Sequence, residues 1–213
     1  MATQPSSRAE GDGPLVILLG GAPGTGKTTI ANLLQRELGL SHHLSTGFIR
    51  ASITHLLPEL EAGILKHHTY DAYQALQRAG ATGSVGYDNG LLLEGAIRQS
   101  TLLKPAIESC INRAVREGIG LVLEGSHFLP GVLEPGILDV TQLCILDVPD
   151  REELKLRVLS SNHSRRRLSD AQLGRLVQLQ EGILELAQIH RQPVVINGDL
   201  STVVKQIQKL VGQ

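Results

Sequence analysis

Residues 20–29 read Gly-Gly-Ala-Pro-Gly-Thr-Gly-Lys-Thr-Thr, and they decide the fold class of this 213-residue chain. They contain the complete phosphate-binding pattern Gly-x-x-x-x-Gly-Lys-Thr, from Gly21 to Thr28. A continuous apolar run, Leu15 to Leu19, precedes the pattern and is typical of a strand buried on both faces of a parallel sheet. An apolar helix face follows it, formed by Ile30, Leu33, Leu34 and Leu38. Strand, glycine loop and helix together predict the first unit of a P-loop domain.

The residue types in this loop suit the phosphates of a nucleotide. Glycines let backbone amides turn toward phosphate oxygens, and the positive end of the following helix points at the same place. Lys27 is expected to contact the β and γ phosphates, and the Thr28 hydroxyl is expected to bind Mg²⁺. The residues expected to bind ATP from this loop are Gly21, Gly24, Thr25, Gly26, Lys27, Thr28 and Thr29.

The rest of the chain alternates between short apolar segments and helical patterns. Further strands are expected at 43–45, 119–123, 143–146 and 194–196. Helices are expected at 69–79, at 91–117 with a kink or break at Pro105, and at 201–211. This order predicts a single α/β domain over residues 14–213, in which helices flank a five-stranded parallel sheet. Residues 1–13 are polar and are predicted to form a disordered leader, and the glycine-rich residues 80–90 a loop.

Composition excludes several classes of protein. A net charge of −1 and an aromatic fraction of 2% argue against nucleic-acid binding. No apolar run is long enough to cross a membrane, and the N-terminus lacks the features of a secretion signal. Two isolated cysteines, Cys110 and Cys144, predict reduced thiols. A cytoplasmic protein is therefore expected, and the sequence does not indicate its oligomeric state.

Two further groups are candidates for the chemistry of phosphoryl transfer. An acid should end another buried strand near the magnesium ion, and both Glu124 and Asp147 fit; we favour Glu124 because Gly-Ser-His follows it. Residues 160–168 contain Arg165, Arg166 and Arg167 and are expected to form a small basic lid over ATP, although an exposed charged loop is the alternative. Lys27, Glu124, Arg165 and Arg166 are the predicted catalytic residues, with Arg165 also contacting ATP.

Candidates for binding a second substrate lie beyond the second predicted strand. Parallel strands end at one edge of a sheet, where ligands bind. Arg50 could pair with a carboxylate or phosphate, or could form a surface ion pair. Thr46, Arg50, Lys104 and His127 are the residues expected to bind a small phosphorylated or carboxylated acceptor.

These segments resemble a known family. Residues 20–29, Leu-Ser-Thr-Gly-Phe-Ile-Arg at 44–50, Leu-Glu-Gly-Ser-His-Phe-Leu-Pro-Gly at 123–131 and Pro-Val-Val-Ile-Asn at 193–197 occur in the order found in the 2-phosphoglycerate kinases. The resemblance implies a nucleoside-kinase-like P-loop fold and transfer of the γ-phosphate of ATP, with Mg²⁺, to 2-phosphoglycerate, giving 2,3-bisphosphoglycerate. The family pattern has Asp where this chain has Gly47, and the resemblance leaves Glu124 or His127 as the candidate base.

Two other functions are compatible with the sequence. A P-loop kinase could instead phosphorylate another metabolite or a nucleotide sugar, as in zeta-toxin-like kinases. A catalytically silent ATP-binding regulator is the alternative outside enzymes, and Gly47 is its motivation. The intact Lys27 and the arginine segment argue against that alternative, because a mere binder has less need of groups that stabilise a transition state.

Overall fold

Short apolar runs form the inner strands of a central sheet. The computed structural model describes residues 13–58, 62–78, 89–160 and 168–212. The strands are β1 (Val16–Gly20), β2 (His42–Ser45), β3 (Leu121–Glu124), β4 (Gln142–Asp147) and β5 (Val194–Ile196). All pairs are parallel, in the order β2-β3-β1-β4-β5. The five strands expected from the sequence are therefore confirmed.

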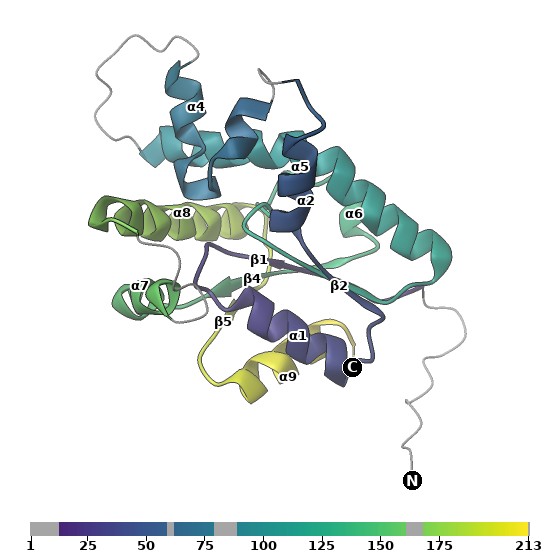
Figure 1. Cartoon of the computed structure of the whole chain (residues 1–213). Helices are drawn as coiled ribbons and strands as arrows, with labels where there is room; N and C mark the ends of the chain where they lie inside the picture. Colours follow the sequence, from purple (N-terminus) through teal and green to yellow (C-terminus); the bar gives the residue numbers. More distant parts are fainter. Residues whose placement is uncertain (1–12, 59–61, 79–88, 161–167, 213) are drawn as a thin grey trace.

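Helices cover both faces of the sheet (Figure 1). One face carries α1 (Lys27–Glu37) and α9 (Leu200–Leu210), and the other carries α5 (Asn89–Glu117) and α8 (Asp170–Ile189). Alternate residues of β1 serve the two layers: Ile17 and Leu19 join the core beneath α1 and α9, whereas Val16 and Leu18 join the core beneath α5 and α8. Burial on both faces explains why this strand has no polar alternation.

Shorter elements complete the chain. They are α2 (Thr46–Thr54), η1 (Gly63–Lys66), η2 (Thr69–Asp71), α4 (Tyr73–Arg78), α6 (Pro135–Leu138) and α7 (Arg151–Leu159). Side chains cap several helix starts: Ser45 accepts a hydrogen bond from the amide of Gly47, and Asp150 accepts from the amides of residues 152 and 153. In the part of the chain that the structure describes, no helix has the length and apolar character needed to cross a membrane.

One helix expectation is corrected, and of the two alternatives expected at Pro105, a kink or a break, the structure excludes the break. The helix expected at 69–79 is instead the 3₁₀ turn η2 followed by α4; Asp71, the last residue of η2, pairs with the Arg175 guanidinium of α8, with 2.7 Å between Nη2 and Oδ1. Pro105 does not divide α5, which is continuous from Asn89 to Glu117. Pro105 is exposed, so water can bind the carbonyl that proline leaves without an intrahelical partner. The predicted leader, the loop and the basic lid fall almost wholly on residues 1–12, 79–88 and 161–167, outside the described residues.

The register of the sheet brings functional segments to one edge. Glu124, the last residue of β3, pairs with Leu19 of β1 on one side and with Ser45 of β2 on the other. The glycine loop after β1, the start of α2 and the turn after β3 therefore meet at the carboxyl edge of the sheet, as expected for an open α/β fold.

Candidate active site

The loop between β1 and α1 has the backbone conformation that its glycines permit. Gly21, Gly24 and Gly26 have φ angles of 132°, 89° and 86°. A Cβ atom at Gly26 would overlap the side-chain amide of Asn197, and one at Gly24 would overlap Val158. No side chain caps the start of α1, so its amides are available to an anion. This geometry is that of a phosphate-binding loop.

Lys27 lies buried at the base of this loop. Its Nζ donates to the carbonyl of Ala22 at 2.8 Å and lies 3.4 Å from Thr25 Oγ1. Burial lowers the pKa of Lys27 to about 8, and the nearby Glu124 carboxylate opposes part of that shift. The ammonium group is therefore held inside the cleft at a position where phosphate oxygens could replace the carbonyl as its partner.

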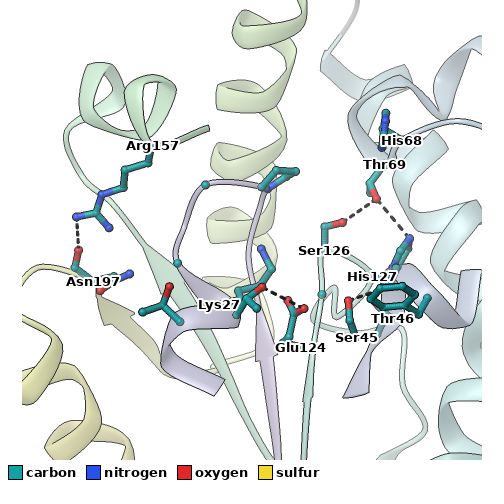
Figure 2. A pocket seen from close by; sticks show the side chains of 18 of the residues that line it. Lys27, Ser45, Thr46, His68, Thr69, Glu124, Ser126, His127, Arg157 and Asn197 are labelled. Carbon is teal, nitrogen blue, oxygen red and sulfur yellow. Dashed lines mark hydrogen bonds between the residues drawn. The ribbon is translucent and has the colours of Figure 1, made fainter. Parts of the chain in front are cut away.

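Thr28 and Glu124 form an oxygen pair beside Lys27. Thr28 Oγ1 donates to Glu124 Oε1 over 3.3 Å, and Glu124 is 6% exposed (Figure 2). Hydroxyl and carboxylate oxygens are suitable ligands for a hard divalent cation. Asp147, the other acid considered, bonds instead to Arg151 and Gln180, which links β4 to the helices that follow.

A cleft of about 910 Å³ has this loop on one wall and other segments of the chain on the facing wall. Figure 2 shows Lys27 and Glu124 between two groups, with Arg157 and Asn197 on one side and Thr46, Thr69, Ser126 and His127 on the other. The sequence-predicted residues that line the cleft are Gly24, Gly26, Lys27, Thr28, Thr29, Thr46, Arg50, Glu124 and His127. Thr25 is buried behind it, with its hydroxyl donating to the carbonyl of Ala22 at 2.9 Å.

The first side of the cleft connects α7, the turn after β5 and the glycine loop. Asn197 Nδ2 donates to the carbonyl of Thr25 at 2.8 Å. Arg157 donates to the backbone carbonyl of Asn197 at 3.1 Å and to Glu153 Oε1 at 2.6 Å. Leu200, 42% exposed, adds an apolar surface to the same side. A guanidinium beside an apolar side chain suits the flat face of a nucleobase.

The opposite side contains a chain of buried hydrogen bonds. His127 Nδ1 lies 2.7 Å from Thr46 Oγ1, and His127 Nε2 lies 3.2 Å from Gln99 Oε1 and 3.4 Å from Thr69 Oγ1. Thr69 Oγ1 lies 2.7 Å from Ser126 Oγ. Burial, with the charges of Arg50 and Lys27, lowers the pKa of His127 to about 3. His127 is therefore neutral, and both of its ring nitrogens have partners.

Arg50 lines the second side and also holds its backbone. Its Nη1 donates to the carbonyls of Leu65 and His67, the second over 2.9 Å. Gln99 Nε2 donates to the same His67 carbonyl at 3.0 Å. Arg50 therefore lies in the cleft at a position fixed by the segment before η2.

Not every predicted site residue lies in the cleft. Lys104 is absent from the cleft lining and pairs with Glu134, so the expectation that it binds the acceptor is corrected: its position on α5 directs it to the α6 region. Arg165 and Arg166 lie outside the described residues.

Sequence reasoning assigned no role to Gln99 or Gln180. Both are completely buried amides, and they lie among apolar residues on the core-facing sides of α5 and α8. The sequence does carry a signal for such residues: a polar residue stands where the helical pattern predicts an apolar, buried one. Because buried polar groups require partners, that residue is expected to make specific hydrogen bonds. Gln180 follows Leu176 and Leu179 on the buried face of α8, and it reaches the glycine loop.

Comparison with known proteins agrees with the fold and the resemblance. Residues 2–82 match the Zeta toxin family model. The chain is 29% identical to a 2-phosphoglycerate kinase of Pyrococcus furiosus, covering 91% of this chain and 63% of that protein. It is 30% identical to a 2-phosphoglycerate kinase of Pyrococcus horikoshii, covering 94% of this chain and 65% of that one. The resemblance to this family is confirmed, and the chain spans less than two thirds of the length of these relatives.

A solved structure supports the fold independently. Shikimate kinase from Acinetobacter baumannii aligns with a TM-score of 0.51, covering 93% of this chain and 94% of that one, at 14% identity. Together with the parallel sheet and the glycine loop, this confirms the expected P-loop kinase fold.

Proposed function

We propose that this chain is an ATP-dependent kinase that transfers the γ-phosphoryl group to the hydroxyl of 2-phosphoglycerate, giving 2,3-bisphosphoglycerate. The observation that carries the proposal is that one cleft is lined both by a phosphate-binding loop with Lys27 and by Arg50 and Ser126. The relatives named 2-phosphoglycerate kinase, similar over more than nine tenths of this chain, support this acceptor.

The donor half would bind ATP through its phosphates and its base. The amides at the start of α1 and the Lys27 ammonium would face its phosphate chain. Arg157 and Leu200 would enclose the base, because they line the cleft on the side of α7 and the turn after β5. Lys27 is protonated when the phosphates arrive, since their negative charge favours the ammonium form.

Thr28 and Glu124 fit a magnesium ion. Both side chains offer oxygen atoms, and they lie 3.3 Å apart beside Lys27. When bound, Mg²⁺ neutralises charge on the phosphate oxygens of the nucleotide. Thr28 would bind it directly, and Glu124 through a water molecule.

The acceptor half would orient the reacting hydroxyl. Its oxygen attacks the γ-phosphorus, the bond from that phosphorus to the bridging oxygen of ADP breaks, and the hydroxyl proton leaves late in the transfer. Such a loose transition state needs positioning and charge more than a strong base, so Gly47 is compatible with activity. We assign the proton to the Glu124 carboxylate, because neutral His127 already uses both ring nitrogens.

The contribution of Arg165 and Arg166 remains a prediction from the sequence. Cations that close over the nucleotide would stabilise charge on the transferring group.

An ADP-release assay with Mg-ATP and a panel of acceptors tests the proposal. The panel contains 2-phosphoglycerate, other phosphorylated or carboxylated alcohols, and a nucleotide sugar because of the match to the Zeta toxin model. We expect 2-phosphoglycerate to stimulate release in the wild type and in Lys205→Ala, an exposed lysine on α9, but not in Lys27→Ala. Stimulation by another acceptor alone would reject 2-phosphoglycerate and keep the kinase. ATP binding without stimulation by any acceptor would favour a silent regulator.

A further inference from the structure

We propose that Ser126 binds the acceptor by donating its hydroxyl hydrogen to an anionic oxygen, which belongs to a carboxylate or a phosphate. This inference rests on the proposed function, since it assigns a partner within the same cleft. Ser126 lines the cleft and is half-buried, directly after Gly125 in the turn that follows β3. The direction of the hydrogen bonds behind it shows why its proton is free.

Gln99 sets which atom donates and which accepts in each of the hydrogen bonds behind Ser126. Its Nε2 donates to the carbonyls of Ile64 and His67, at 2.7 and 3.0 Å. The reversed amide would place its oxygen against two carbonyl oxygens, so this orientation is set by its surroundings. Gln99 Oε1 is consequently the atom that faces His127, and it can only accept.

His127 takes its tautomer from Gln99. The proton lies on Nε2, which donates to Gln99 Oε1 at 3.2 Å. Nδ1 is then the unprotonated nitrogen, and it accepts from the Thr46 hydroxyl at 2.7 Å. A second proton on the ring is disfavoured because the ring is buried and close to Arg50 and Lys27.

The tautomer of His127 also decides which of the Thr69 and Ser126 hydroxyl groups donates to the other. Its hydroxyl cannot donate to His127 Nε2, because that nitrogen carries the proton. Thr69 is 4% exposed, and among the hydroxyl contacts of the described residues Ser126 Oγ, at 2.7 Å, is the acceptor that remains. Thr69 therefore donates to Ser126, which leaves the Ser126 hydrogen available to an acceptor in the cleft that Ser126 lines.

A free hydroxyl donor at this place selects oxygen atoms that accept. Hydrogen bonds to charged acceptors are stronger than those to neutral ones, so an anionic oxygen gains most from it. Carboxylate and phosphate share this chemistry, and 2-phosphoglycerate carries both. Ser126 thus adds a neutral contact for the acceptor in the cleft that Arg50 also lines.

Three acceptors distinguish the two anionic groups. They are 2-phosphoglycerate, glycerol 2-phosphate, in which a hydroxymethyl group replaces the carboxylate, and glycerate, in which a hydroxyl group replaces the phosphate. The kcat/KM for each is measured with the wild type, Ser126→Ala and the exposed control Ser41→Ala, located at the opposite end of β2. Binding of each acceptor is measured by calorimetry alongside.

We expect Ser126→Ala to lower kcat/KM for 2-phosphoglycerate by about tenfold or more, with ATP affinity unchanged. The loss should shrink to less than about threefold for the analogue that lacks the contacted group, whereas Ser41→Ala should match the wild type. A dependence on the carboxylate or on the phosphate identifies the source of the anionic oxygen.

Equal losses with all three acceptors, or no loss with 2-phosphoglycerate, would overturn the inference while the proposed function stands. If the wild type phosphorylates none of the three, the proposed function fails separately. Calorimetry then decides the role of Ser126: weaker binding of 2-phosphoglycerate by Ser126→Ala upholds it, and equal binding or no binding overturns it.

Discussion

Gln180 on α8 accepts a hydrogen bond from the backbone amide of Ala22, in the phosphate-binding loop, over 2.8 Å. Its Nε2 donates to the carbonyl of Leu146 and to Asp147 Oδ1, both at 3.0 Å. The amide is completely buried, and all three bonds are made within the protein. One side chain of α8 therefore fixes the start of the loop against the end of β4.

Replacing Gln180 with leucine should disturb the loop without touching a ligand. The amide of Ala22 and the carbonyl of Leu146 would lose a partner in the interior, which typically costs about 1–3 kcal/mol. We expect a lower free energy of unfolding in urea and weaker ATP binding by calorimetry. Gln188→Leu, at an exposed position of the same helix, is the control. Unchanged ATP affinity in Gln180→Leu would show that the loop does not depend on this contact.

Lys27→Met should stabilise the nucleotide-free protein while abolishing phosphoryl transfer. The folded protein releases the Lys27 proton near pH 8, whereas the unfolded chain holds it up to about 10.5. Burial of the charged lysine thus destabilises the native state by roughly 3 kcal/mol at neutral pH. Unfolding takes up a proton between these two pKa values, so raising the pH through that window relieves the cost.

Urea unfolding of the wild type and Lys27→Met at pH 7 and pH 10 checks this prediction. The variant should be more stable at pH 7, and the difference should shrink at pH 10. A variant that is less stable at both pH values would mean that the contacts of Lys27 with Ala22 and Thr25 outweigh the cost of burying its charge.

His127 should remain neutral at every pH above about 5. Its pKa is about 3 in the folded protein and close to 6.5 in the unfolded chain. The unfolded chain therefore binds the extra proton first, and stability should fall as the pH falls from 6.5 toward 3. Nitrogen-15 NMR of the histidine rings should show one neutral ring, protonated on Nε2, with no titration above pH 5. Titration of that ring near 6.5, or a proton on Nδ1, would contradict the hydrogen-bond directions derived above.

Gly125→Ala should disturb the side of the cleft that we propose binds the acceptor. A Cβ atom at residue 125 would overlap the Thr46 hydroxyl, which is bonded to His127. Displacing these buried groups should cost about 1–3 kcal/mol of stability and weaken acceptor binding more than ATP binding. Gly136→Ala is the matched control, because nothing lies within 4 Å of the added carbon. Thermal unfolding and KM for each substrate measure both effects, and equal behaviour of the two variants would argue against a tightly packed wall.

Local patterns in the sequence predicted the strands of the sheet and the edge at which the site lies. The strands β1, β3 and β4 are short, almost wholly buried runs, and Glu124 ends β3 at the edge where the glycine loop also lies. Those features depend on neighbouring residues in the chain, which a sequence displays directly.

Contacts between distant residues could not be predicted in the same way. Asp71 pairs with Arg175, which is 104 residues away in the sequence, and Lys104 pairs with a glutamate 30 residues away. Gln99 and Gln180 lie on helices, and their partners are loop backbone atoms 32 and 158 residues distant. Helical spacing indicates that such positions are buried, but it does not indicate what they contact.

The most direct test follows the phosphoryl group itself. The protein is incubated with γ-³²P-labelled ATP, Mg²⁺ and 2-phosphoglycerate, and the products are separated, with Lys27→Ala in parallel. We predict that label appears in 2,3-bisphosphoglycerate with the wild type and is lost with Lys27→Ala. Label found only in inorganic phosphate or remaining in ATP would contradict the proposed transfer to 2-phosphoglycerate.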